Sequence, residues 1–267
     1  MDKEKLKKLA QDKRFIPGIY NYCDRWCERC SFTSRCLNFA TSEEDFSDPE
    51  TQDIRNEKFW KKISESFQVT MELLKEAAEE QGIDLDAVDV KEAQEERRLT
   101  RESAKDHEVC RMAAAYIDMV EEWFAGVRGF FSSPDKDAES EPKGKIYSDN
   151  KHRDPTSAEE AMEVIRWYQH QIYVKLMRAV QGHMEERAES FDDEFAKDSD
   201  GSAKVALIGM DRSIAAWGEV RGLFPLQGDL ALRIIIHLET LRRKVEKTLV
   251  HARAFIRPGF DEIKLSS

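Results

Sequence analysis

Four cysteines near the N-terminus are the residues of this chain with the clearest chemistry. They lie within fourteen residues in a C-x3-C-x2-C-x5-C spacing, at Cys23, Cys27, Cys30 and Cys36. Thiolates are soft ligands that bind zinc and iron–sulfur clusters, and four thiols at such short intervals are typical of a metal site. The spacing therefore predicts that these four side chains bind a common metal ion or metal cluster.

The spacing favours a [4Fe-4S] cluster over a single zinc ion. All four cysteines come from one continuous segment, whereas structural zinc sites commonly take their ligands from two separated C-x2-C pairs. Trp26 and Phe32 lie between the cysteines and would shield a cluster from water. The arginines of the same segment would offset the negative charge of the cluster; they are Arg25, Arg29 and Arg35. One structural zinc ion remains the alternative cofactor, and redox-active thiols are a third reading.

The C-x2-C-x5-C spacing of residues 27–36 resembles the [4Fe-4S] loop of DNA glycosylases of the endonuclease III type and of AddB-type nucleases. The resemblance implies a role as cluster ligands for the four cysteines. It implies no catalysis, because neither a helix-hairpin-helix motif nor a nuclease core accompanies the loop. The first three cysteines also match the radical-SAM triad, which is disfavoured because Arg29 replaces an aromatic residue and Cys36 would fill the open iron site.

Two arginine–histidine pairs, Arg178-x4-His183 and Arg101-x5-His107, are similar to the R-x4-6-H signature of HEPN helical ribonucleases. The resemblance implies RNA cleavage by such a pair at a dimer interface. No histidine belongs to a Glu-x-x-His motif of the di-iron type, and the phosphate-binding and nucleophile-elbow glycine motifs are missing from the sequence. Catalysis is therefore unsupported by the sequence.

Two further residues are predicted to be structural. Cys110 lies on the apolar side of a helical pattern and is interpreted as a small buried hydrophobe. His237 lies in a run of aliphatic residues, where an imidazole usually makes a buried hydrogen bond, with Arg233 or Glu239 as the nearest candidates in sequence.

Composition limits the compartment and the partners of the protein. The 267 residues include 40 % hydrophobic residues, with no run of apolar residues long enough to cross a membrane and a charged N-terminus. We therefore expect a soluble cytoplasmic protein without membrane contact, in a compartment that disfavours disulfides. The net charge is −11, but residues 1–40 carry nine Lys and Arg against five Asp and Glu. Only this basic N-terminal segment is suited to bind nucleic acid, and a protein or redox partner is the better expectation.

Apolar residues recur every three or four positions over most of the chain, which predicts an all-α protein. The expected helices span about 49–82, 101–131, 157–191, 202–224 and 229–257. Asp48 and Pro49 are typical of the first helix start, and Gly82 of its end. The first two helices are expected to pair antiparallel, and polar residues 132–156 are expected to form a mobile linker.

These patterns predict two parts, a cysteine-rich metal-binding segment over residues 1–45 and an antiparallel bundle of four to five long helices over residues 46–267. The favoured function is a [4Fe-4S] protein whose cluster has a redox, sensing or structural role. The alternatives are a zinc-stapled module for protein interaction and a HEPN-like ribonuclease. The oligomeric state is not determined by the sequence.

Overall fold

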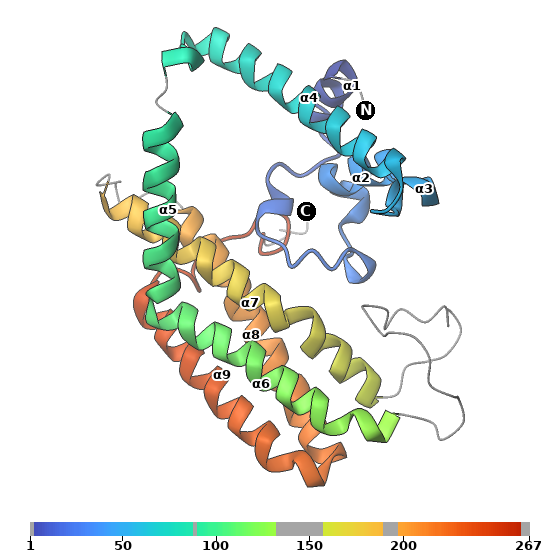
Figure 1. The fold of residues 1–267 in the computed structure, drawn as a ribbon, viewed down its shortest axis with the longest axis vertical. Coiled ribbons are helices and arrows are strands. Elements are labelled where there is room, and N and C mark those ends of the chain that lie inside the picture. Colours follow the sequence, from blue (N-terminus) through green and yellow to red (C-terminus); the bar gives the residue numbers. More distant parts are fainter. Residues whose placement is uncertain (1–2, 88–89, 132–156, 189–196, 263–267) are drawn as a thin grey trace, which may run out of the picture. The chain divides into compact units, whose positions relative to one another are not determined.

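The computed structural model describes residues 3–87, 90–131, 157–188 and 197–262, and in these residues it contains α-helices and short 3₁₀ turns but no strand. The all-α prediction is confirmed (Figure 1). The linker predicted at residues 132–156 lies outside the described part of the chain. No helix within that part is both long and apolar enough to cross a bilayer.

The chain folds into two compact units. The first unit contains Met1–Leu99 and Ile256–Ser267, and the second contains Thr100–Phe255. The boundary predicted after residue 45 therefore falls inside the first unit, and the C-terminal segment belongs with the N-terminal residues. The helices of the first unit are α1 (Lys3–Ala10), α2 (Leu37–Asp45), α3 (Pro49–Gln52), α4 (Glu57–Gln81) and most of α5 (Val90–Asp106).

In the described part of the second unit, four long helices form an antiparallel bundle (Figure 1). They are α6 (Glu108–Phe131), α7 (Ser157–Ala188), α8 (Asp198–Leu223) and α9 (Gly228–Thr248). The helices α7 and α9 both pack against α8, and α6 packs against α7 and α9. Each apolar stripe is thereby buried against two neighbours, which is the usual way in which helices without a sheet build a core.

Aromatic side chains fill the centre of this bundle. Trp123 of α6 and Trp217 of α8 are fully buried, and their rings meet edge to face with centroids 5.2 Å apart. The indole Nε1 of Trp217 donates to the hydroxyl of Tyr116 at 3.2 Å. On α8, Gly209 lies against α7, because a Cβ atom there would come within 2.9 Å of the ring of Tyr168. The bundle is therefore closely packed around large rings and small residues.

The two residues interpreted as structural lie in this bundle. Cys110 is 0 % exposed on α6, as predicted. His237 of α9 is half-buried, and its Nε2 lies 2.8 Å from the backbone carbonyl oxygen of Met112. This partner comes from a different helix and is neither of the two residues suggested by the sequence.

The first predicted helix starts as expected and then breaks. The carboxylate of Asp48 caps α3 by accepting from the amide of Glu50 at 3.0 Å. The helix stops at Gln52, and α4 begins after a second cap, Asn56, whose side chain accepts from the backbone N–H of the second helical residue. Gly82 ends α4 with a φ of 68°, as predicted.

The second predicted helix is also divided. A helix that the sequence analysis missed, α5, ends at Asp106, and α6 begins one residue after the bend at His107. The amide of Val109 donates to Nδ1 of His107 at 3.4 Å, so the imidazole takes the place of an N-cap side chain. The predicted antiparallel pairing of the first two helices concerns α4 and α6, which belong to different units, and it stays a prediction. Within the second unit, α6 packs against α7 and α9.

Candidate metal centre

Short 3₁₀ turns position the four cysteines of the first unit. Cys23 follows η1 (Ile19–Asn21), Cys27 begins η2 (Cys27–Arg29) and Cys30 ends it. Cys36 ends η3 (Thr33–Arg35) and begins α2. The amides of Cys30 and Cys36 close these turns on the carbonyls three residues earlier, at 3.1 and 3.2 Å. Each cysteine is therefore set at a tight turn of one continuous loop.

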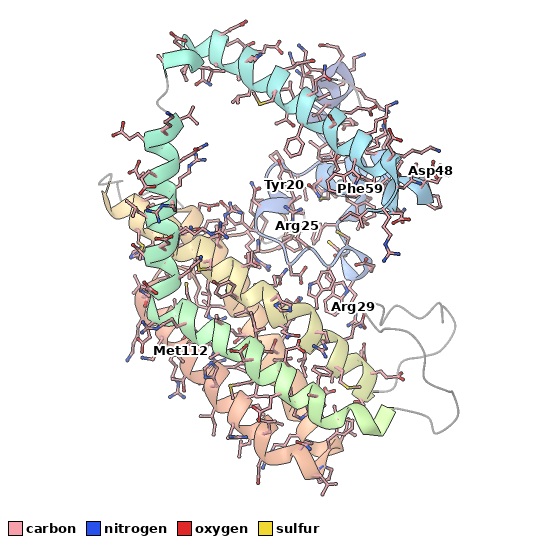
Figure 2. All side chains as sticks on the ribbon, in the orientation of Figure 1. Tyr20, Arg25, Arg29, Asp48, Phe59 and Met112 are labelled. Atoms are coloured by element: carbon pink, nitrogen blue, oxygen red, sulfur yellow. The ribbon has the colours of Figure 1, made fainter. Side chains whose placement is uncertain are left out.

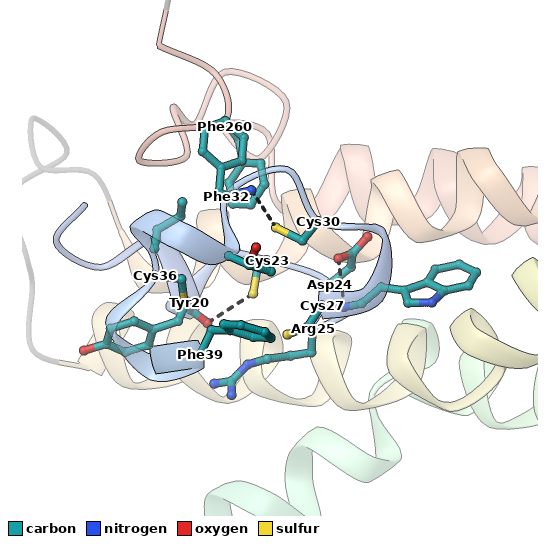
Figure 3. Close-up of a pocket in the computed structure, with 13 residues that line it drawn as sticks. Tyr20, Cys23, Asp24, Arg25, Cys27, Cys30, Phe32, Cys36, Phe39 and Phe260 are labelled. Carbon is teal, nitrogen blue, oxygen red and sulfur yellow. Dashed lines mark hydrogen bonds between the residues drawn. The ribbon is translucent and has the colours of Figure 1, made fainter. Parts of the chain in front are cut away.

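All four cysteines line one pocket of this loop (Figure 3). Apolar and aromatic side chains form most of the remaining wall; they include Ile19, Tyr20, Trp26, Phe32, Phe39 and Phe260. In residues 3–87, 90–131, 157–188 and 197–262, no three His, Cys, Asp or Glu side chains are arranged to hold one metal ion. The cysteines thus share a pocket without three of them surrounding a single ion position.

The sulfur atoms of the centre influence one another electrostatically. Burial raises the pKa of the Cys27 thiol, and the neighbouring Cys23, Glu28, Cys36 and Cys30 raise it further. A raised pKa means that the uncharged thiol is favoured, because several negative charges in one apolar pocket repel one another. A cation placed among the four sulfurs would reverse this preference and make thiolates of them.

Two of the sulfur atoms form hydrogen bonds with the backbone of the loop. The amide of Phe32 donates to Sγ of Cys30 at 3.4 Å, an interaction that stabilises a thiolate. The thiol of Cys23 donates to the carbonyl oxygen of Tyr20 at 3.5 Å (Figure 3). Ionisation of Cys23 would remove this second bond, so the sulfur becomes available to a metal when it loses its proton.

Three arginines lie along the cysteine loop, and one of them, Arg25, lines the pocket. Arg25, Arg29 and Arg35 are exposed, and Figure 2 labels the first two of them on the loop. The guanidinium carbon of Arg29 lies 4.2 Å from the ring centroid of Trp26. Arg25 has a φ of 58°, a left-handed conformation that is uncommon for a residue with a side chain. The carboxylate of Asp24 accepts from the amide of Trp26 at 3.2 Å across this residue and supports the bend. Trp26 is thereby turned inward and is 5 % exposed.

The arginine–histidine pairs of the sequence lie in a different setting. Arg178 forms a two-pronged ion pair with Asp198, with distances of 2.9 and 2.6 Å. Burial lowers the pKa of His107, and Glu108 raises it in part. His183 also lowers the pKa of His107 electrostatically, which indicates that the two histidines lie near each other. The ribonuclease hypothesis stays a prediction, because the comparisons and the geometry do not test it.

A buried carboxylate near these histidines was not identified from the sequence. Asp200 on the first turn of α8 is 8 % exposed, and burial raises its pKa. His251 and His183 act in the opposite direction and stabilise its charge. The residues come from separate elements, so no spacing in the sequence could have indicated the group. The described side chains of this group do not include three that are arranged around one ion.

Comparison with known proteins gives no relative for this chain: no family model, curated protein or solved structure matches it.

The raised pKa of Cys27 predicts its reactivity in the metal-free protein. At pH 7.5 we expect Cys27 to react with iodoacetamide more slowly than free cysteine, because only the thiolate is nucleophilic. The rate should rise with pH as the thiol ionises. Burial raises the pKa of Cys110 to about 12, so this residue should stay unmodified until the bundle unfolds. Mass spectrometry of peptides after timed alkylation between pH 7 and 10 measures both rates.

The sign of the linked stability follows from the same shift. A raised pKa contributes stability that is present below the ordinary pKa of a thiol and is lost as the pH rises through the shifted value. The metal-free first unit should therefore lose stability in alkaline solution. A Cys27 that reacts as fast as free cysteine at pH 7.5 would contradict this description of the pocket.

Proposed function

We propose that this protein binds a [4Fe-4S] cluster through Cys23, Cys27, Cys30 and Cys36, and that the cluster has a redox, sensing or structural role. The observation that carries the proposal is that four cysteines of one continuous loop line a single apolar pocket. Nothing else among the described residues gathers so many soft ligands.

The spacing of the cysteines favours a cluster over one zinc ion, because all four come from one continuous loop. Zinc bound by four thiolates has Zn–S distances near 2.3 Å, which brings the sulfurs to about 3.8 Å from one another in a tetrahedron. The thiolates of a cubane bind four different iron atoms and are therefore farther apart. Four cysteines of one loop that line a single pocket are placed to bind such a cluster.

The surroundings of the pocket are also suited to an anionic cluster. Aromatic walls exclude water, and the exposed arginines of the loop, of which Arg25 lines the pocket, would offset part of the negative charge of four thiolates and the inorganic core. The amide of Phe32 donates to Cys30, and hydrogen bonds of this kind raise the reduction potential of iron–sulfur clusters. The half-buried cysteines place the cluster near the surface, where it can exchange electrons with a partner or respond to an oxidant. A reducing cytoplasm is the compartment in which such thiolates persist.

Metal and sulfide analysis tests the proposal directly. Protein purified without oxygen, or reconstituted with iron and sulfide, is expected to contain about four iron atoms and four sulfides per chain and to absorb broadly near about 400 nm. The zinc alternative predicts a colourless protein with about one zinc per chain. A colourless protein that takes up neither iron nor sulfide after reconstitution would overturn the proposal.

A further inference from the structure

Residues 256–262, which we call the C-terminal strap, form one wall of the cysteine pocket. The ring of Phe260 lines the pocket and meets the ring of Phe32 at a centroid distance of 4.9 Å and an interplanar angle of 67° (Figure 3). Phe32 is the residue whose amide donates to Sγ of Cys30. The strap thus supports, from a distant part of the sequence, the segment that hydrogen-bonds a proposed ligand.

The strap is held against the loop by a contact that only glycine permits. Gly259 has a φ of 75°, and a Cβ atom there would lie 2.8 Å from Cδ1 of Ile16 and 3.1 Å from Cδ1 of Ile19. Ile16 and Ile19 are both buried, at 9 % and 2 % exposure. The backbone of the strap therefore lies directly on the apolar base of the cysteine loop.

An internal ion pair gives the strap its shape. The guanidinium of Arg257 donates to both carboxylate oxygens of Asp261, at 3.0 and 2.9 Å, and its backbone amide donates to the same carboxylate at 3.0 Å. The guanidinium carbon also lies 4.9 Å from the ring centroid of Phe260. These contacts bring the ring to the pocket as part of a preformed turn, which lowers the entropy lost on docking.

The covalent position of the strap connects the pocket to the bundle. The chain passes between the two compact units at residues 99–100 and again at residues 255–256, where the strap begins. The strap therefore directly follows one of the two points at which the chain passes between the units, and undocking of the strap would free the residues next to that point.

We propose that docking of the C-terminal strap and occupancy of the cysteine centre are thermodynamically linked, so that loss of the cluster releases the strap. This inference rests on the proposed function, because it needs a bound group in the pocket. A group that contacts the walls stabilises the closed pocket, and by reciprocity the closed pocket retains the group more tightly. The strap has few buried side chains of its own, so the contacts around Phe260 decide whether it stays docked.

Hydrogen exchange of the full-length protein tests the first half of the linkage. Backbone amides of residues 256–262 should exchange on the order of tenfold faster in chelator-stripped protein than in the cluster-loaded protein, because release of the strap exposes them to solvent. The amides of the bundle helices serve as an internal reference and should be unchanged. Equal exchange of the strap in both forms overturns the inference.

Release of iron to a ferrous chelator tests the reciprocal half. Phe260→Ala should lose its cluster on the order of tenfold faster than the unsubstituted protein, followed by the fall in absorbance near about 400 nm. Ile256→Ala is the matched control, because it lies in the same strap and is 66 % exposed. Phe260→Leu retains an apolar wall and should restore most of the retention if Phe260→Ala assembles too little cluster to measure. Release at the original rate from both Phe260 variants would contradict the inference.

The outcomes separate this inference from the proposed function. A protein that binds zinc in place of iron overturns the cluster but leaves the linkage testable by zinc release. A protein that binds no metal overturns both. If the protein binds a full cluster but the strap amides exchange at the same rate in the loaded and stripped forms, the linkage alone is overturned.

Discussion

Replacing any one of the four loop cysteines by serine is expected to lower the absorbance near about 400 nm and the iron bound per chain by about twofold or more. The tested positions are Cys23, Cys27, Cys30 and Cys36. A serine hydroxyl is a hard and weakly acidic ligand, and three remaining thiolates leave one iron atom without a protein ligand. Iron and sulfide assays on anaerobically reconstituted variants measure the effect.

Cys110→Ala is the control for this series. Cys110 is fully buried in α6 and lies in the other compact unit, so its variant should keep a full complement of iron and sulfide. Normal iron content in two or more of the loop variants would show that the loop does not ligate the metal. Loss of iron in Cys110→Ala with the helices intact would place a ligand in the bundle.

Trp217→Ala is expected to lower the free energy of unfolding of the bundle by about 3–5 kcal/mol. The indole is fully buried, packs on Trp123 with centroids 5.2 Å apart and donates to the hydroxyl of Tyr116 at 3.2 Å. The substitution would leave a large cavity between α6 and α8 and would remove one of the hydrogen-bond partners of the buried Tyr116 hydroxyl. Urea unfolding followed by circular dichroism measures the loss.

A surface residue of the same unit provides the comparison for Trp217→Ala. Leu226 is 84 % exposed, so Leu226→Ala should change the free energy of unfolding by no more than about 0.5 kcal/mol. Cluster content gives a second readout, because every residue that lines the cysteine pocket belongs to the first unit. A variant that loses the cluster before the bundle unfolds would argue against two separate units.

The helical class of the protein could be predicted from its sequence, because apolar residues at helical spacing require a buried stripe. Gly82 and Asp48 were also sufficient to predict a helix end and a helix start. The breaks after Gln52 and at His107 could not be predicted in this way. Each break depends on one capping side chain, Asn56 or His107, which starts a new helix. The helical spacing of the apolar residues continues across both breaks and does not reveal them.

The shared pocket of the cysteines could be predicted from their spacing, but its walls could not. Cys23 and Cys36 are thirteen positions apart and are joined by tight turns, so local sequence is enough to bring them to one pocket. Phe260 reaches the same pocket from the far end of the chain, and nothing near it in sequence indicates this contact. Metal binding stays a prediction that is based on the residue type and spacing of the cysteines and supported by their shared pocket.

The return of the last residues to the first unit gives the chain the layout of an inserted domain. Thr100–Phe255 is a continuous stretch that interrupts a host whose own sequence resumes at Ile256. An inserted domain can be replaced or lengthened without altering the sequence of the host on either side of it. The host unit, in contrast, folds from two separate chain segments and needs both of them. Truncation after residue 255 therefore damages the small N-terminal unit more than the large helical one that directly precedes the cut.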